Sequence, residues 1–227
     1  MPKNLETEKR FAAKEAVKFI GSDRIVGLGS GSTAAYAVRE LGKAVKNGLR
    51  IQAVPTSDET RRLAESLNIP LIDINTVDSI DITIDGADEF NPDLVLIKGG
   101  GGALLREKIV ASMTKEEIII ADSTKKVDVL GKFKLPIEVI PFASNYVLRQ
   151  IEIIGGSGKI RVRNDRPFVT NEGNYIIDSD FGEIFDPEYL SNKLNGIAGV
   201  VAHGLFINLA SRIIMGSENG IEIFDAK

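Results

Sequence analysis

The sequence contains no cysteine, and its only histidine is His203. Without cysteine the chain cannot form disulfides, zinc ribbons, iron–sulfur clusters or a thiol nucleophile. One histidine cannot build a multi-histidine metal site, although carboxylates can still hold a hard cation. His203 lies in an apolar stretch, so we interpret it as a structural residue. Any chemistry must therefore use carboxylates, lysines, hydroxyls and backbone amides.

Long apolar runs and blocks of like charge are missing as well. No run approaches the roughly 18 residues of a membrane span, and the charged N-terminal stretch does not resemble a secretory signal. The 28 basic and 32 acidic side chains are interspersed and give a net charge of −4. A basic surface for nucleic acid or an anionic membrane is not indicated. We therefore expect a cytoplasmic protein with neither of these partners.

The first half of the chain alternates short apolar strands with helices. Because this alternation is typical of a parallel sheet flanked by helices, we predict an α/β fold with a Rossmann-like, doubly wound, mainly parallel sheet. Ser57 is expected to cap one of the helices. In one strand, Ile80, Ile82 and Ile84 are expected to share a face. The expected helices are residues 6–20, 34–45, 57–67 and 103–113, and the expected strands are 24–28, 49–54, 69–72, 80–85, 94–97 and 118–121.

The pattern changes after about residue 127. Strands are expected near residues 137–140, 159–162, 168–170 and 175–178, with helices capped by Ser144 and beginning near Pro187. This order is typical of a small α+β domain with an antiparallel, ferredoxin-like sheet. We therefore predict a Rossmann-like catalytic domain of residues 1–127 plus about 204–227, and a smaller domain of about 128–203.

A glycine-rich turn, residues 27–33, follows the first strand and precedes a helix. Its glycines can gather several N–H groups, and the helix that follows adds the positive end of its dipole. The hydroxyls of Ser30, Ser32 and Thr33 are further donors. No P-loop lysine is present, so a nucleotide is not specifically indicated. The turn is either an anion cradle or a packing device between strand and helix.

Three carboxylates follow another strand, in the segment Asp85-Gly86-Ala87-Asp88-Glu89. Clustered carboxylates must be held by donors, protons or a cation. A simple turn could use aspartate and glycine for their backbone freedom, but it would not need three carboxylates. We favour binding of sugar hydroxyls or proton transfer, with a magnesium site as the competing interpretation.

Lys98 precedes four glycines, residues 99–102, and a helix that carries Glu107. Such a glycine run suits a backbone that approaches a ligand closely and donates N–H groups to an oxyanion. Apolar neighbours of Glu107 would raise its pKa and make it a better base, although the helix N-terminus opposes this shift. The alternative is a surface glutamate favoured by the helix dipole. Lys125 follows a later strand and either reaches an anion at this edge of the sheet or remains a solvated loop lysine. For Lys9, the neighbouring sequence gives little support for a role in binding.

Together these segments resemble the A type of ribose-5-phosphate isomerase. The resemblance covers nearly the whole chain, and the motifs are specific in combination. Two residues depart from the pattern usual in this family: Ser30 stands where threonine is usual, and Gly102 where alanine is common. Both keep the size and donor character that the site needs. The motifs are residues 27–34, 85–89, 98–108, 121–125, 130–136 and 138–141.

The resemblance implies reversible conversion of D-ribose 5-phosphate into D-ribulose 5-phosphate, in the non-oxidative pentose phosphate pathway, without a cofactor or metal. Glu107 would move a proton between C1 and C2 through an enediolate. Asp85 and Asp88 would help to open the ring, and Lys98 would stabilise the enediolate oxygen. A homodimer or homotetramer is implied. The residues expected to bind substrate are Asp85, Gly86, Ala87, Asp88, Lys98, Gly99, Gly100 and Gly101, with Ser30, Gly31, Ser32, Thr33, Lys125 and Lys9 chiefly at the phosphate.

Two other functions stay open. A CoA-transferase of related fold would use a glutamate as nucleophile, but it would normally be longer and give Asp85 and Asp88 no duty. A sugar-phosphate sensor would normally carry a DNA-binding domain, for which 227 residues leave no room.

Overall fold

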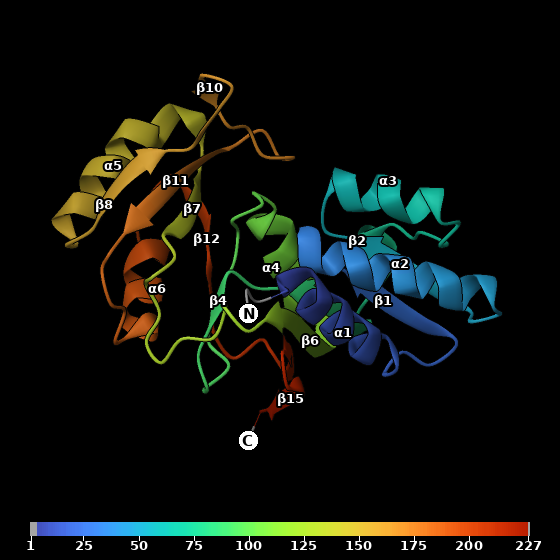
Figure 1. Ribbon diagram of the computed structural model, residues 1–227. Helices are drawn as coiled ribbons and strands as arrows, with labels where there is room; N and C mark the ends of the chain where they lie inside the picture. The colour runs from blue at the N-terminus through green and yellow to red at the C-terminus, as the bar shows by residue number, and fades with distance from the viewer. Residues whose placement is uncertain (1–3, 227) are drawn as a thin grey trace.

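The computed structural model describes residues 4–226 and is built around a six-stranded sheet (Figure 1). The strand order is β15-β14-β6-β3-β1-β2, and every pair is parallel except β14 with β15. The predicted α/β class with a mainly parallel sheet is therefore confirmed. The strands are β1 (Arg24–Leu28), β2 (Ile51–Pro55), β3 (Ile80–Gly86), β6 (Thr114–Asp122), β14 (Arg212–Ser217) and β15 (Gly220–Asp225).

Helices cover both faces of this sheet. The helices α1 (Leu5–Val17), α2 (Ser32–Lys46) and α3 (Asp58–Ser66) pack on one face, and α4 (Leu104–Ser112) packs on the other. Small residues let α1 approach the sheet closely, because a Cβ on Gly216 of β14 would lie 2.0 Å from the Glu8 carbonyl oxygen. Ser57 caps α3 as predicted, since its hydroxyl accepts a hydrogen bond from the Thr60 amide.

Strand β3 is buried on both faces, although its sequence alternates apolar and polar residues. Ile82 and Ile84 join the core under α1 and α2, as expected. Ile80, at the entry to the strand, packs instead with Val54 and Val110. The polar face, with Thr83 and Asp85 each only 1% exposed, lies under α4. The alternation therefore places polar groups beneath the helix that carries Glu107.

Two expected strands of the first half are wrong in detail. Residues 69–72 form only an isolated bridge between Leu71 and Ala53, because Pro70 lacks the N–H that a longer ladder needs. Residues 94–97 contribute only β5 (Leu96–Ile97), which lies outside the main sheet because the chain turns at Leu94, where φ is +59°. β5 pairs antiparallel with β4 (Glu89–Phe90) and β13 (Leu205–Phe206).

A second, antiparallel sheet has the order β12-β7-β11-β8. One face packs against the helices α5 (Ser144–Ile153) and α6 (Pro187–Asn195). Ser144 is the first residue of α5 rather than its cap, because the chain becomes helical one residue earlier than expected and Ala143 takes the cap position. The expected strand at 168–170 is a single bridge at Val169. The strands are β7 (Leu135–Val139), β8 (Ser157–Ile160), β11 (Tyr175–Asp180) and β12 (Val200–His203), with a short hairpin of β9 (Val162–Arg163) and β10 (Arg166–Pro167).

Helix α4 lies between the two sheets (Figure 1). Its Leu104 packs with Ile176 and Ala202 of the second sheet, whereas its Ala111 packs with Ile119 of the first. The C-terminal strands return to the first sheet, as predicted. The division into two domains stays a prediction, and residues 1–3 and 227 of that division lie outside the described residues. None of the helices in residues 4–226 has the length and hydrophobicity needed to span a bilayer.

Candidate active site

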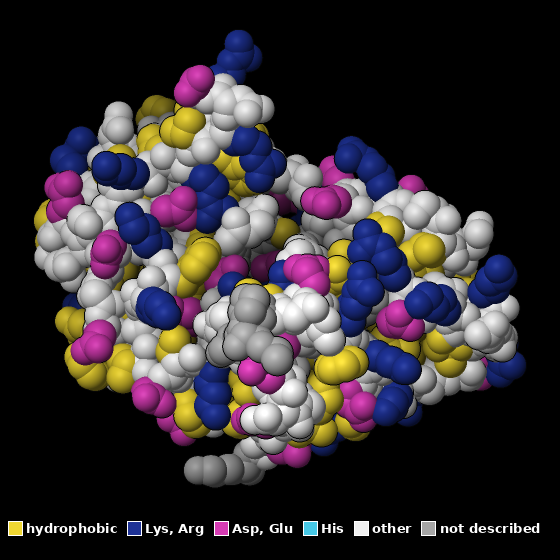
Figure 2. Space-filling view, viewed as in Figure 1, with side chains coloured by type: hydrophobic (Ala, Val, Ile, Leu, Met, Phe, Trp, Pro, Cys, Tyr) yellow, Lys and Arg dark blue, Asp and Glu magenta, His cyan; other side chains and the backbone are white. Residues whose placement is uncertain are grey.

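A cavity of about 220 Å³ lies at the carboxyl ends of β1, β3 and β6, where ligands bind in open α/β sheets. All four segments singled out in the sequence contribute to its wall. In Figure 2, Lys and Arg side chains are spread over both halves of the visible face and are mixed with Asp and Glu. The lining residues are Leu5, Lys9, Ser30, Gly31, Ser32, Thr33, Gly86, Ala87, Asp88, Lys98, Gly99, Gly101, Glu107, Asp122, Thr124 and Lys125.

The glycine turn after β1 is held by Asp85. One carboxylate oxygen, Oδ1, accepts the Ser30 amide at 3.1 Å and the Gly86 amide at 2.6 Å. A Cβ on Gly29 would lie 2.1 Å from this oxygen, so only glycine allows the approach. Gly31 has φ +93°, which L side chains rarely adopt, and it leads directly into α2. Asp85 is therefore behind the cavity wall, where it fixes the turn.

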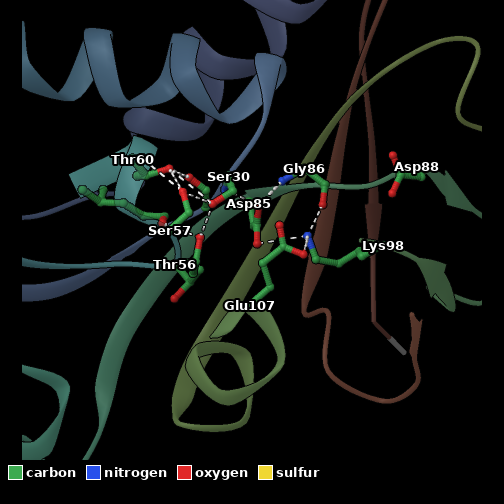
Figure 3. Close-up of polar contacts among 12 residues, drawn as sticks. Ser30, Thr56, Ser57, Thr60, Asp85, Gly86, Asp88, Lys98 and Glu107 are labelled. Atoms are coloured by element: carbon green, nitrogen blue, oxygen red, sulfur yellow. Dashed lines mark hydrogen bonds and ion pairs between the residues drawn. The ribbon is translucent and has the colours of Figure 1, made fainter. Parts of the chain in front are cut away.

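The Ser30 hydroxyl belongs to a cluster of four hydroxyls (Figure 3). It lies 2.8 Å from the hydroxyls of Thr56 and Ser57 and 3.3 Å from that of Thr60. Thr60 in turn donates to the Gly29 carbonyl oxygen at 2.9 Å. The Ser30 side chain therefore joins the glycine turn to the start of α3.

Lys98 places a buried ammonium between two carboxylates (Figure 3). Its Nζ lies 3.0 Å from Asp85 Oδ2 and 3.5 Å from Glu107 Oε2, and it donates to the Gly86 carbonyl oxygen at 2.5 Å. Burial by itself lowers the pKa of Lys98, but the Asp85 and Glu107 carboxylates outweigh it and raise this pKa above its ordinary value. The site therefore holds a fixed positive charge.

Glu107 lies in the first turn of α4 and is only 6% exposed. Its Oε2 accepts no hydrogen bond from any described residue. Burial raises the pKa of Glu107 to about 8; Lys98 opposes the shift, and Asp85 and Asp88 add to it. This direction agrees with the shift expected from the sequence. A buried carboxylate that has a raised pKa and an oxygen without a hydrogen-bond donor is suited to take a proton from carbon.

Asp88 lies against the glycine run that follows Lys98. Its Oδ2 accepts the Gly100 amide at 2.7 Å, and a Cβ on Gly100 would lie 2.6 Å from Oδ1. Gly102 has φ +90°, and its Cβ would lie 2.5 Å from the Phe168 ring. Our expectation that Gly102 simply keeps a small residue is therefore incomplete, because Phe168 fills the space that an alanine methyl would need.

The other end of the cavity combines cations with a helix N-terminus. Ser32 and Thr33 form the first turn of α2. Lys9 Nζ lies 3.3 Å from the Ser32 hydroxyl and 3.0 Å from Glu6 Oε1, and Lys125 lines the same cavity. Lys9, whose neighbouring sequence gave little support for a role in binding, therefore lies beside the glycine turn.

The lining of the cavity differs from the predicted set of site residues in two ways. Asp85 and Gly100 were predicted but do not line the cavity, whereas Leu5, Asp122 and Thr124 line it and were not predicted. Asp122 and Thr124 follow from the rule that sites gather at strand ends, because they stand at the end of β6; Leu5 carries no such signal.

Two further candidates have structural partners. Glu89 accepts hydrogen bonds from the backbone amides of Gly131 and Phe133. Of the three carboxylates in the acidic segment, Glu89 therefore holds a loop, and Asp85 and Asp88 belong to the site. His203 is buried, and its ring nitrogens lie near Ser191 and Lys108. Within residues 4–226, no group of three or more histidine, aspartate or glutamate side chains is arranged to hold a metal ion.

Comparison with known proteins gives a consistent result. The family model described as ribose 5-phosphate isomerase A (phosphoriboisomerase A) matches residues 52–220. A ribose-5-phosphate isomerase A of Bacillus mycoides (strain KBAB4) is 51% identical, and the match covers 94% of this chain and 97% of that protein.

Solved structures agree with this match. A D-ribose-5-phosphate isomerase in complex with phospho-erythronic acid is 41% identical, with a TM-score of 0.95, over 98% of this chain and 99% of that one. The ribose 5-phosphate isomerase of Plasmodium falciparum is 36% identical, with a TM-score of 0.94, over 98% and 100% of the two chains. Because the family model matches residues 52–220 and the relatives match nearly the whole chain, the chain belongs to the ribose 5-phosphate isomerase A family.

Proposed function

We propose that the protein interconverts D-ribose 5-phosphate and D-ribulose 5-phosphate by proton transfer through an enediolate. The observation that carries this proposal is the Glu107 carboxylate, which has a raised pKa and an oxygen that accepts no hydrogen bond from the described residues and lies 3.5 Å from the buried Lys98 ammonium. Abstraction of a proton next to a carbonyl needs this combination of base and fixed positive charge. The phospho-erythronic acid held by a structural neighbour supports a sugar phosphate as substrate.

The proton transfers can be assigned to residues of the cavity. Glu107 takes the proton from C2 of the open-chain aldose, and the electron pair moves onto O1 to give the enediolate. Lys98 and the amides of the glycine run stabilise that oxygen. Asp88, which lines the cavity, assists ring opening and transfer of the hydroxyl proton from O2 to O1. Glu107 then returns its proton to C1, which leaves the C2 carbonyl of the ketose.

Asp85 has a different task in this scheme. It is buried behind the cavity, where it holds the Ser30 and Gly86 amides and the Lys98 ammonium. Asp85 thereby keeps Lys98 charged and in place, and its contact with substrate hydroxyls, expected from the resemblance, stays a prediction. The phosphate is assigned to the N-terminus of α2, with Ser32, Thr33, Lys9 and Lys125 around it.

Replacing Lys125 with alanine should raise KM for ribose 5-phosphate with little change in kcat. A phosphate contact persists from the bound substrate to the transition state, so its loss weakens binding uniformly. Steady-state kinetics on Lys125→Ala, with Lys126→Ala as the neighbouring control, measures this split. A large fall in kcat at unchanged KM would instead place Lys125 in the chemical step.

The pH dependence of kcat/KM follows from the raised pKa of Glu107. The base must be ionised, so kcat/KM should increase with pH and level off above about 8, the pKa of this group. The substrate phosphate loses its second proton near pH 6, so a profile recorded from about pH 7 to 9.5 isolates the enzyme group. A flat profile over that range would show that Glu107 is already ionised at neutral pH.

Exhaustive treatment with EDTA should leave the activity unchanged, because a lysine ammonium and backbone amides stabilise the enediolate in this scheme. The assay compares chelated enzyme with enzyme supplied with Mg²⁺. Loss of activity on chelation and recovery with Mg²⁺ would instead identify Asp85 and Asp88 as metal ligands.

A coupled assay of ribulose 5-phosphate formation tests the proposed function itself. Turnover of ribose 5-phosphate supports it, and binding without turnover would indicate a sugar-phosphate sensor. A glutamyl thioester trapped with borohydride would indicate a CoA-transferase. Assembly into a homodimer or homotetramer and a cytoplasmic location stay predictions.

A further inference from the structure

Arg161 links the second sheet to the glycine run of the candidate site. It follows β8, and its side chain is 14% exposed. Its Nη1 donates to the carbonyl oxygens of Gly99 and Gly100, each at 3.0 Å. Its Nε and Nη2 donate to the two carboxylate oxygens of Asp178, at 2.9 and 2.5 Å. The guanidinium is therefore oriented by a bidentate ion pair and directed at two successive peptide groups.

One of these peptide groups carries the amide that is bonded to Asp88, and the other carries the amide of a residue that lines the cavity. A peptide unit is planar, so fixing the Gly99 carbonyl also fixes the Gly100 N–H, and fixing the Gly100 carbonyl fixes the Gly101 N–H. The Gly100 amide donates to Asp88, and Gly101 lines the cavity. Donation to a carbonyl also polarises the amide of the same peptide, which makes it a stronger donor.

Glycine makes this restraint necessary. A run of four glycines has the widest backbone freedom of any sequence, so its N–H groups have no fixed direction of their own. Oxyanion stabilisation depends on donors that are oriented before the charge develops. The Arg161 backbone is itself anchored, because its amide donates to the Ile176 carbonyl and its carbonyl accepts the Phe168 amide.

We propose that Arg161 is a positioning residue, which holds the Gly99–Gly101 backbone so that the Gly101 amide points at the enediolate oxygen while the Gly100 amide stays bonded to Asp88. This inference rests on the proposed isomerase function and adds to it a residue that directly follows a strand of the second sheet. Lysine cannot substitute fully, because its point charge cannot bridge two carbonyls and a carboxylate in one plane.

The test compares Arg161→Met with Arg163→Met. Arg163 is two positions along the same segment and lies over the Phe168 ring at 4.6 Å. We expect Arg161→Met to lose about 10- to 100-fold in kcat, the effect of small misplacements, while KM stays within about threefold. Affinity for phospho-erythronic acid, whose carboxylate would occupy the enediolate position, should weaken by about tenfold or more. Arg163→Met should match the wild type in all three quantities.

Arg161→Lys covers the case in which the methionine variant does not fold. It should keep KM and lose about three- to tenfold in kcat, because lysine keeps the positive charge but lacks the planar set of N–H donors of the guanidinium. The inference is overturned if a folded Arg161→Met keeps kcat and phospho-erythronic acid affinity within about twofold of wild type. When only Arg161→Lys folds, the same result in that variant overturns it. A change in KM alone, with kcat unchanged, also overturns the inference. Absence of isomerase activity in the wild type would instead overturn the proposed function.

Discussion

Replacing Glu107 with glutamine is expected to reduce kcat at least about a hundredfold, because general-base catalysis contributes about 10²–10⁴-fold. Glutamine has nearly the same shape, so the protein should fold and bind ribose 5-phosphate normally. The amide cannot accept a proton from carbon, and no other carboxylate of the cavity wall has a buried oxygen that lacks a hydrogen-bond donor among the described residues. Steady-state kinetics and equilibrium binding of ribose 5-phosphate measure the two effects separately.

Glu117 supplies a matched control for this variant. It lies in β6, is 2% exposed, and has a buried Oε2 without a partner in the described part of the chain. Burial, reinforced by the nearby Asp85 carboxylate, raises the pKa of Glu117 well above its ordinary value, but Glu117 does not line the cavity. Glu117→Gln should therefore keep activity within about twofold of wild type. Equal losses in both variants would mean that Glu107 acts through packing alone.

Replacing Lys98 with methionine is expected to lower kcat by about 10²–10³-fold, the effect of removing one oxyanion donor. A second consequence follows from the contacts of Lys98. Its ammonium opposes the rise in the pKa of Glu107, so the rise of kcat/KM should move to higher pH in the variant. Breaking the buried pair with Asp85 should also destabilise the fold by about 3–5 kcal/mol.

Lys115→Met is the control for these measurements, because Lys115 is an exposed lysine paired with Asp81 at 2.9 Å. It should change neither kcat nor the pH profile. A Lys98→Met enzyme with near-normal kcat would show that the backbone amides alone stabilise the enediolate. A pH profile that moves to lower pH would contradict the placement of Lys98 beside Glu107.

Local sequence patterns are sufficient to predict most of the first sheet. Apolar strands followed by glycine-rich turns and amphipathic helices specify parallel strands, and the strand-end rule then brings the motifs at Ser30, Asp88 and Lys125 to one edge. Glu107 is also predictable, because apolar residues surround it on its own helix.

Other features depend on contacts between distant segments. The Ser30 hydroxyl faces Thr56, Ser57 and Thr60, which only the packing of α3 beside the turn reveals. Strand β5 leaves the main sheet because of one left-handed residue, Leu94.

Arg161 is the clearest example of this dependence. Its sequence neighbours give no sign of a site, since its partners Gly99 and Gly100 lie about sixty positions earlier in the chain. Periodicity describes one element at a time, so it carries no information about which elements meet.

Exchange of the substrate C2 proton in deuterated water tests the central claim most directly. Nuclear magnetic resonance of ribose 5-phosphate incubated with wild type, Glu107→Gln and Asp85→Asn would follow that proton during turnover. We predict that wild type exchanges the proton with solvent and that Glu107→Gln loses both exchange and turnover. Near-normal exchange and turnover in Glu107→Gln, with loss of both in Asp85→Asn, would contradict the account and make Asp85 the base.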